Sequence, residues 1–366
     1  MRASIVEHLV CPDTGAPLRL EVHDQRGEHV LEGTLVTTSD ETRRYAIRGG
    51  VPRFVEAEQL PGAQRDTIAA FAYKWSRIPG YAHEQATKRQ RERWYYERFN
   101  FPHGDADVRA FLGNARFVLE AGTGTGVDTD LLARNCDGLV FGIDLSSAIE
   151  LAYERLHAHP RVVLLQADLA RLPFQPGFFD VISCDQVLHH TPDPPAHFQR
   201  LVRLLRPGGH LLLYVYRVKG PLREFADDYL RGLLTQAPLA QCLAFSEKIT
   251  RLGRALSRLR ATVQIEDDIP ELGLQRGTYD VQRLIYDHVL KCFWNDDYDF
   301  LTNVMVNFDW YRPVHAFRYT EADVRGWCQA EGLEIQHMDI APSGISTVLR
   351  KPALHDRHAA SPVDRH

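Results

Sequence analysis

The chain has 366 residues, enough for a full hydrophobic core and for more than one domain. Its 43 lysine and arginine residues are outnumbered by 48 aspartate and glutamate residues, and the resulting net charge of −5 does not favour broad nucleic-acid binding. No apolar run approaches the roughly 20 residues of a membrane span, so we expect a protein with no membrane partner.

Residues 1–60 predict a small β-rich domain, in the stretches LVCPDTGAPLRLE and GTLVTTSDETRRYAIRGGVPRFV. These stretches resemble the frame of a zinc-ribbon module, in which a second cysteine follows Cys11. Thr14 stands at that position, and residues 38–42 contain no cysteine. One thiolate cannot complete the tetrahedral ligand set of zinc, so we expect no structural metal. The domain would dock onto the rest of the chain or onto a partner, or would cover apolar surface.

Residues 61–116 predict a helical lead-in that follows the Pro61-Gly62 linker. Its second helix is the charged segment KRQRERWYYERF. The charges from Lys88 to Arg93 are typical of a helix face in contact with solvent. Trp75 is interpreted either as a packed core aromatic or as a residue that faces a ligand.

The stretch FVLEAGTGTG, from Phe117 to Gly126, predicts a buried strand, a glycine turn and the start of a helix. Glycine suits such a turn because the backbone bends sharply and because a Cβ atom would keep a ligand away. The dinucleotide-binding fingerprint would require a third glycine at Val127, and a P-loop would require Gly-Lys-Ser or Gly-Lys-Thr. Neither is present, so the turn does not predict a phosphate site.

Four further strands are expected in the next ninety residues. Acidic residues end three consecutive strands, namely Glu120, Asp144 and Asp168, and the carboxyl ends of parallel strands form the ligand edge of an open α/β sheet. Carboxylates there suit a ligand with hydroxyl and amino groups. The strands come from LVFGIDLS (139–146), RVVLLQADL (161–169), FDVISC (179–184) and LLRPGGHLLLYVY (204–216), the last after a Pro-Gly-Gly turn.

The Glu-x-Gly-x-Gly-x-Gly motif and the acids after it resemble the class I S-adenosylmethionine (SAM) dependent methyltransferases over residues 117–216. The resemblance implies SAM as cofactor and a Rossmann-like α/β fold, with a seven-stranded sheet whose last strand is antiparallel. Asp144 would accept from the ribose hydroxyls, Asp168 from the adenine amino group, and the glycine turn would pass under the methionine part. The implied cofactor-binding residues are Glu120, Gly122, Thr123, Gly124, Gly126, Asp144, Leu145, Asp168, Leu169, Cys184, Gln186 and Trp75.

Candidate catalytic residues follow the fourth strand in the segment DQVLHH. Methyl transfer from a sulfonium mainly requires alignment and exclusion of water, and a base is needed only where the acceptor loses a proton. His189 or His190 would serve as that base because histidine titrates near neutral pH, with Asp185 as the third candidate. The histidines would otherwise only order the loop. Two adjacent ring nitrogens rarely converge on one ion, so no metal site is expected.

The same resemblance suggests that Trp75 faces the sulfonium and that Lys74 or Arg77 meets the methionine carboxylate. About a hundred residues then separate the fifth strand from FRYTEADVRGWCQAEGLEIQ, far more than a usual connection. This insertion is expected to be a helical lid whose aromatic residues form an acceptor pocket. Its segment KITRLGRALSRLRA is amphipathic and basic, which also suits contact with RNA or a membrane surface.

We therefore expect a SAM-dependent methyltransferase that acts on a small molecule of secondary or envelope metabolism. An RNA methyltransferase and a SAM-binding protein without transfer activity remain as alternatives, and a homodimer is left open. The six cysteines form no CxxC pair and the N-terminus lacks a signal-peptide pattern, so a cytoplasmic location is expected. The expected organisation is a degenerate ribbon (1–60), a helical lead-in (61–116), a SAM-binding core (117–216), a lid (217–312), the end of the core with a helix capped at Thr320 and two strands (313–352), and a disordered tail (353–366).

Overall fold

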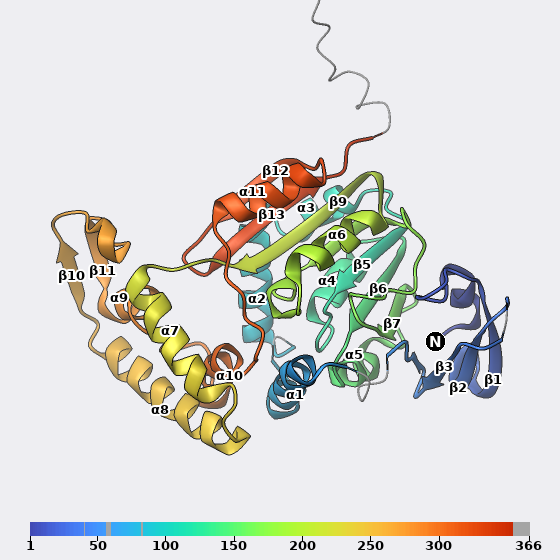
Figure 1. Cartoon of the computed structure of the whole chain (residues 1–366), viewed down its shortest axis with the longest axis horizontal. Coiled ribbons are helices and arrows are strands. Elements are labelled where there is room, and N and C mark those ends of the chain that lie inside the picture. The colour runs from blue at the N-terminus through green and yellow to red at the C-terminus, as the bar shows by residue number, and fades with distance from the viewer. Residues whose placement is uncertain (40, 56–59, 82, 354–366) are drawn as a thin grey trace, which may run out of the picture.

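The computed structural model describes residues 1–366 except 40, 56–59, 82 and 354–366, so nearly all of the predicted tail lies outside the described residues. The fold is mixed α/β, as predicted, and its centre is a seven-stranded sheet in the order β12-β13-β9-β8-β5-β6-β7 (Figure 1). Its strands are β5 (Phe117–Ala121), β6 (Leu139–Asp144), β7 (Val162–Gln166), β8 (Phe179–Cys184), β9 (Leu205–Tyr216), β12 (Glu334–Ile340) and β13 (Gly344–Arg350).

The last strand is antiparallel, which confirms that prediction. β13 pairs antiparallel with both β9 and β12, whereas β5 to β9 pair parallel with one another. The start of β9 differs from the prediction, because the strand begins at Leu205, before the Pro-Gly-Gly turn. Its pairing with β8 shifts from Phe179–Leu205 to Val181–His210, so the turn residues bulge out of the ladder within the strand.

Side chains of the central strands alternate between two faces and enter two separate hydrophobic clusters. Val118 and Val140 face the cluster beneath α2, α3, α4 and α5, whereas Leu119 and Phe141 face the cluster beneath α6 and α11. Thr320 caps α11 in a reciprocal capping box with Asp323, as predicted. These helices are α2 (Gln85–Arg98), α3 (Asp105–Leu112), α4 (Val127–Arg134), α5 (Ala148–Leu156), α6 (Pro194–Leu204) and α11 (Glu321–Ala330).

The N-terminal residues form an antiparallel sheet that lies beyond the β7 edge of the main sheet (Figure 1). A parallel bridge joins Arg53 to Gln166 of β7, and the Phe54 amide donates to the Gln166 carbonyl at 2.8 Å. Leu9 and Leu35 belong to the same hydrophobic cluster as Phe141 of the main sheet, so the two sheets share one core. The elements are a short 3-10 helix (Ala3–His8), β1 (Leu18–Arg26), β2 (His29–Thr37), β3 (Arg44–Arg48) and β4 (Val51–Pro52).

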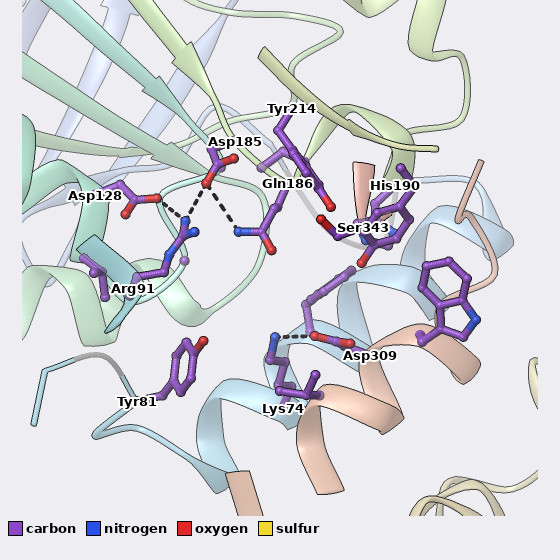
Figure 2. Close-up of a pocket in the computed structure, with 18 of the residues that line it drawn as sticks. Lys74, Tyr81, Arg91, Asp128, Asp185, Gln186, His190, Tyr214, Asp309 and Ser343 are labelled. Atoms are coloured by element: carbon purple, nitrogen blue, oxygen red, sulfur yellow. Dashed lines mark hydrogen bonds and ion pairs between the residues drawn. The ribbon is translucent and has the colours of Figure 1, made fainter. Parts of the chain in front are cut away.

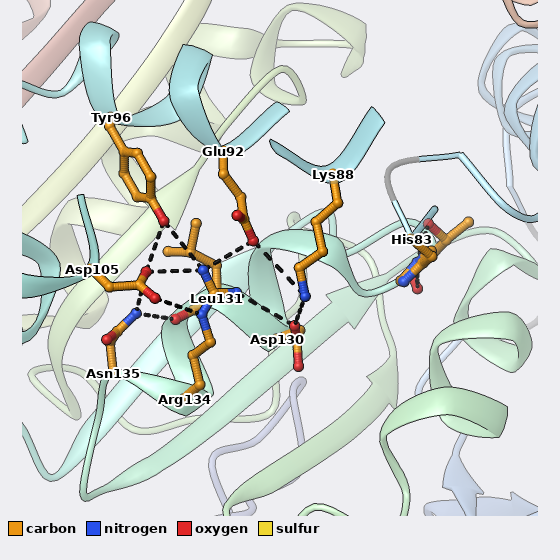
Figure 3. A network of polar contacts seen from close by, with 10 residues as sticks. His83, Lys88, Glu92, Tyr96, Asp105, Asp130, Leu131, Arg134 and Asn135 are labelled. Atoms are coloured by element: carbon orange, nitrogen blue, oxygen red, sulfur yellow. Dashed lines mark hydrogen bonds and ion pairs between the residues drawn. The ribbon is translucent and has the colours of Figure 1, made fainter. Parts of the chain in front are cut away.

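The charged run from Lys88 to Arg93 of α2 is exposed at Arg89 and Arg93 but buried at Arg91, so the prediction of a solvated helix face holds for only part of the run. Lys88 pairs with Asp130 of α4 at 2.9 Å, and Glu92 pairs with Arg134 at 2.9 Å (Figure 3). These two ion pairs connect α2 to α4.

The insertion after β9 is mainly helical, but it also contains a two-stranded hairpin. It packs against α1 (Gly62–Arg77), and Ala70 of α1 shares a hydrophobic cluster with Met305 and Phe308 of the insertion. None of the described helices has the length and apolar character needed to cross a membrane. The insertion elements are α7 (Pro221–Leu234), α8 (Leu239–Arg258), β10 (Thr262–Ile265), β11 (Gly277–Asp280), α9 (Val281–His288) and α10 (Phe300–Tyr311).

Candidate active site

A cavity of about 810 Å³ lies at the carboxyl ends of the parallel strands. Its floor is formed by the glycine turn and the strand ends, and its other walls come from α1, α2 and the insertion. Figure 2 shows residues of α1, α2, the insertion and the segments at the ends of β8 and β9 around the same space. This volume falls within the usual range for a site that encloses a small ligand.

The glycines of the turn differ in what they contact. Gly122 has a φ of +93°, and a Cβ atom there would lie 2.1 Å from the Val187 side chain. Gly124 has a φ of +52° and lies under the Trp75 ring, which a Cβ atom would meet at 3.5 Å. Both line the cavity, whereas Gly126 packs away from it against Leu156 of α5. Trp75 therefore covers the turn on the cavity side.

Glu120 is buried, Asp144 is half-buried, and hydrogen bonds hold both side chains at the cavity floor. Glu120 accepts from the Thr129 hydroxyl at 2.8 Å, and burial together with the nearby Asp128 raises its pKa well above the ordinary value. Asp144 accepts from the Gly124 amide at 2.8 Å and from the Ser146 amide at 2.7 Å. Burial raises its pKa although these hydrogen bonds oppose the shift. Both side chains are thus fixed in orientation before any ligand binds. Thr123 and Leu145 line the cavity beside them.

Asp168 lies at the end of β7 with Leu169 beside it, and both line the cavity. One oxygen of Asp168 accepts from the Ala170 amide at 2.8 Å, and the other accepts from the Gln64 side chain at 2.9 Å. Gln64 belongs to α1, so the lead-in helix lies directly over this strand end.

The residues of α1 around Trp75 divide into those at the cavity and those outside it. Lys74 lines the cavity but is paired with Asp309 of α10 at 2.5 Å (Figure 2). Arg77 is exposed and does not line the cavity. The Lys74 pair instead connects α1 to the insertion across the cavity wall.

Asp185 is enclosed by two arginines of α2. Arg91 donates to it at 2.6 Å, and Arg98 donates to both of its oxygens, at 2.6 and 2.9 Å. Burial alone would raise the pKa of Asp185, but the Arg98 and Arg91 guanidinium groups outweigh burial and lower it below its ordinary range. Asp185 is therefore a poor proton acceptor.

One side-chain nitrogen of Arg91 has no hydrogen-bond acceptor among the described residues. Its Nη2 atom donates to Asp128 and Asp185, whereas its buried Nη1 atom has no hydrogen-bond partner within the described residues (Figure 2). A guanidinium offers five N–H donors, and a buried one without an acceptor is costly. Arg91 lines the cavity, so its positive charge favours an anionic group of a ligand there.

The loop after β8 brings His190 and Gln186 to the cavity but not Cys184 or His189. Cys184 is buried in β8, and the buried His189 ring packs against Tyr216 with ring centroids 3.7 Å apart. Gln186 has a φ of +61°, which is uncommon for a residue other than glycine, and is one mark of local strain at the loop.

His190 lines the cavity, and its hydrogen bond shows which of its two ring nitrogens carries the proton. Its Nδ1 atom lies 2.7 Å from the His315 carbonyl, which can only accept, so Nδ1 carries the proton. Burial lowers its pKa to about 4, and the ring is therefore neutral at pH 7 with Nε2 free of a proton. A neutral imidazole of this kind can accept a proton from a bound molecule.

The part of the chain with this glycine turn can be compared with known families. Residues 119–213 match the methyltransferase domain family. The matched stretch runs from β5 to β9 and so contains the turn, the acidic strand ends and the loop with His190.

Curated relatives share this part of the chain. The chain is 32% identical over 127 residues to 2-phytyl-1,4-naphtoquinone methyltransferase from Nostoc punctiforme, with 33% of this chain and 54% of that protein covered. It is 36% identical over 162 residues to 27-O-demethylrifamycin SV methyltransferase from Amycolatopsis mediterranei, with 43% and 53% covered. The chain spans about half of the length of these relatives. A solved SAM-dependent methyltransferase from Mesorhizobium loti aligns with a TM-score of 0.38 and 16% identity, covering 67% of this chain and 96% of that one.

The polar cavity residues that sequence reasoning missed include Gln64 and Arg91. Gln64 carries no motif, and its pairing with Asp168 joins residues 104 positions apart. Arg91 lies in a charged run that resembles a solvated face. The one available signal was the aromatic-rich segment WYYERF directly after this run, because its rings indicate that α2 is buried along part of its length.

Proposed function

We propose that this protein is a SAM-dependent methyltransferase that acts on a small molecule. The observation that carries the proposal is one cavity with the glycine turn and three acidic residues at strand ends on one side and an aromatic insertion on the other. A family match to a methyltransferase domain over residues 119–213 supports it. When bound, SAM supplies an activated methyl group on a sulfonium, which is a good leaving group.

The cavity residues fit each part of SAM. Asp144 would accept from the ribose hydroxyls, because a carboxylate has lone pairs beyond those used by Gly124 and Ser146. Asp168 and Gln64 would bind the adenine edge. The Arg91 guanidinium would attract the methionine carboxylate, and the Trp75 ring would cover the methionine part above Gly124.

His190 is the residue that we assign as base where the acceptor loses a proton. Its unprotonated Nε2 and its position at the cavity support this role. Asp185 instead holds Arg91 and Arg98 in place, and His189 packs behind His190. The insertion and α1 contribute by aligning the acceptor with the methyl group and by excluding water.

A small-molecule acceptor is favoured over RNA. Residues 217–312 act as a lid in this proposal, and the rings of Tyr286, Phe293 and Trp310 line the cavity from it. Such an enclosed aromatic wall suits a ring-bearing molecule better than a polynucleotide. The curated relatives above also carry the names of small-molecule methyltransferases. The N-terminal sheet, which we propose is ribbon-like, contributes to the shared core.

Transfer of a labelled methyl group tests this function directly. The protein is incubated with radioactive methyl-labelled SAM and a lysate of the source cells, and RNA, protein and small molecules are then separated. We expect label among the small molecules. Label in RNA would favour the RNA alternative, and no transfer in a preparation that binds SAM would contradict methyl transfer.

The site assignment is tested by Asp144→Ala. We expect the Kd for SAM to rise about 10- to 100-fold, since hydrogen bonds to a charged group are worth roughly 1.5–3 kcal/mol. The Kd is measured by calorimetry, with circular dichroism to establish that the variant is folded. Asp137→Ala is the matched control, because its side chain is 82% exposed and lies away from the cavity. An unchanged Kd in folded Asp144→Ala would show that this carboxylate does not bind SAM.

A further inference from the structure

Cationic side chains line the cavity on the side of the insertion. Lys219 comes from the segment before α7, and Arg223 comes from the start of α7. Arg283 comes from the exposed face of α9. Lys291 comes from the segment after α9 and is 6% exposed. None of these four residues belongs to the SAM-binding strand ends.

These cations differ in whether they have an acceptor. The Arg223 Nε atom donates to Asp227 at 2.9 Å, and Arg223 also donates to the Tyr286 carbonyl. The Lys219 ammonium donates to the Pro342 carbonyl. The Lys291 ammonium lies 4.6 Å from the centre of the Trp310 ring and, within the described part of the chain, has no hydrogen bond or ion pair. Three N–H donors of a buried ammonium are thus without an oxygen acceptor.

The nearby carboxylates do not balance this positive charge. Asp309 is paired with Lys74, and Asp227 is buried against Arg223. Asp287 remains at the cavity, where burial raises its pKa although Lys219 opposes the shift. The pKa of Lys291 is lowered to about 8, chiefly by burial, because the opposing charge of Asp309 does not offset burial and the nearby Arg223. The insertion side of the cavity therefore attracts negative charge.

We propose that the acceptor molecule carries an oxyanion group, a carboxylate or a phosphate, that pairs with Lys291. The inference rests on the proposed function, because it concerns the acceptor of that methyl transfer. An oxyanion supplies the acceptors that the Lys291 ammonium lacks, and a buried charge without a partner is costly. The neighbouring Trp310 and Tyr286 rings pack the apolar part of the acceptor. Lys291 is in this role a specificity-determining residue and not a base.

The charge of the acceptor is measured by fractionation before transfer. A small-molecule extract of the source cells is passed over an anion-exchange resin at pH 9. Unretained neutral and cationic molecules form one pool, carboxylates released at pH 3 form a second, and phosphates that stay bound and are released by salt form a third. Each pool is incubated with the full-length protein and methyl-labelled SAM. We expect label in the second or third pool, and the pool identifies the oxyanion.

Substitution of Lys291 tests whether it is the partner of that anion. Lys291→Met keeps the length of the side chain and removes its charge, and we expect it to lower the initial rate with the active pool about tenfold or more. Lys291→Arg should restore part of the rate, because it restores a cation. Lys248→Met is the control, since Lys248 is exposed on α8 and does not line the cavity.

Three results distinguish a failure of this inference from a failure of the proposed methyl transfer. Label confined to the unretained pool would overturn the inference while supporting methyl transfer. An anionic pool that Lys291→Met labels as fast as the unchanged protein would also overturn it, provided that the variant binds SAM with the same Kd. No label in any pool, with SAM bound, would overturn the proposed function and the inference together.

Discussion

At the scale of single residues, the sequence made Asp185 a candidate base, whereas in the structure it is a buried carboxylate paired with two arginines. Its position after β8 is the same in either role, and its neighbours on α2 decide between them. The Arg91 and Arg98 pairs satisfy both oxygens. Without Asp185, the buried Arg98 guanidinium would lose its carboxylate partner and Arg91 would keep only Asp128. Breaking such a buried pair is more costly than the pair is stabilising.

Asp185→Asn is therefore expected to lower the free energy of unfolding at pH 7 by about 3–5 kcal/mol. Because the folded-state pKa is depressed, the stabilisation is complete above the unfolded pKa of about 3.9 and is lost as pH falls further. The difference between the two proteins should therefore narrow below pH 4. Urea unfolding at pH 7 and pH 3 measures both effects. Asp137→Asn, at an exposed ion pair, should change stability by less than about 1 kcal/mol.

At the scale of elements, the strands and the glycine turn could be predicted from the local sequence pattern, whereas the contacts of the lead-in could not. Each parallel strand is a short apolar run whose burial needs no knowledge of its partner, so its position could be predicted. Arg91 pairs with residues 37 and 94 positions away, and no local period contains that information. The cations of the lid are likewise spread from Lys219 to Lys291, and the fold alone brings them to one wall.

The turn itself provides a test at this scale. Gly122→Ala should lower the free energy of unfolding by roughly 2 kcal/mol or more, because the residue has a positive φ and its Cβ atom would clash with Val187. Gly232→Ala in α7 is the matched control and should raise it by about 0.5 kcal/mol, since nothing lies within 4 Å of its added Cβ atom. Thermal and urea unfolding measure both. Equal effects at the two sites would contradict the packing described for the turn.

At the scale of the whole molecule, the shared core implies that the N-terminal sheet and the main sheet unfold together. Leu9 is 2% exposed and packs in the cluster that also contains Leu35 and Phe141, one from each sheet. Removing its side chain leaves a cavity common to both sheets, so Leu9→Ala should lower the free energy of unfolding by about 2–5 kcal/mol. Because the cluster contains residues of both sheets, we expect one cooperative unfolding transition, and Leu9→Ala should shift the whole transition to lower temperature.

Calorimetry, with fluorescence and circular dichroism as separate probes, measures whether the transition is single. Val22→Ala is the control, since Val22 is 46% exposed on β1 and its loss should change stability by about 0.5 kcal/mol or less. Two transitions, of which Leu9→Ala moves only the first, would mean that the N-terminal sheet is an independent unit. In that case the β7 edge would have to be stable without its cover, and the Arg53–Gln166 bridge would be a contact between folded units and not part of one core.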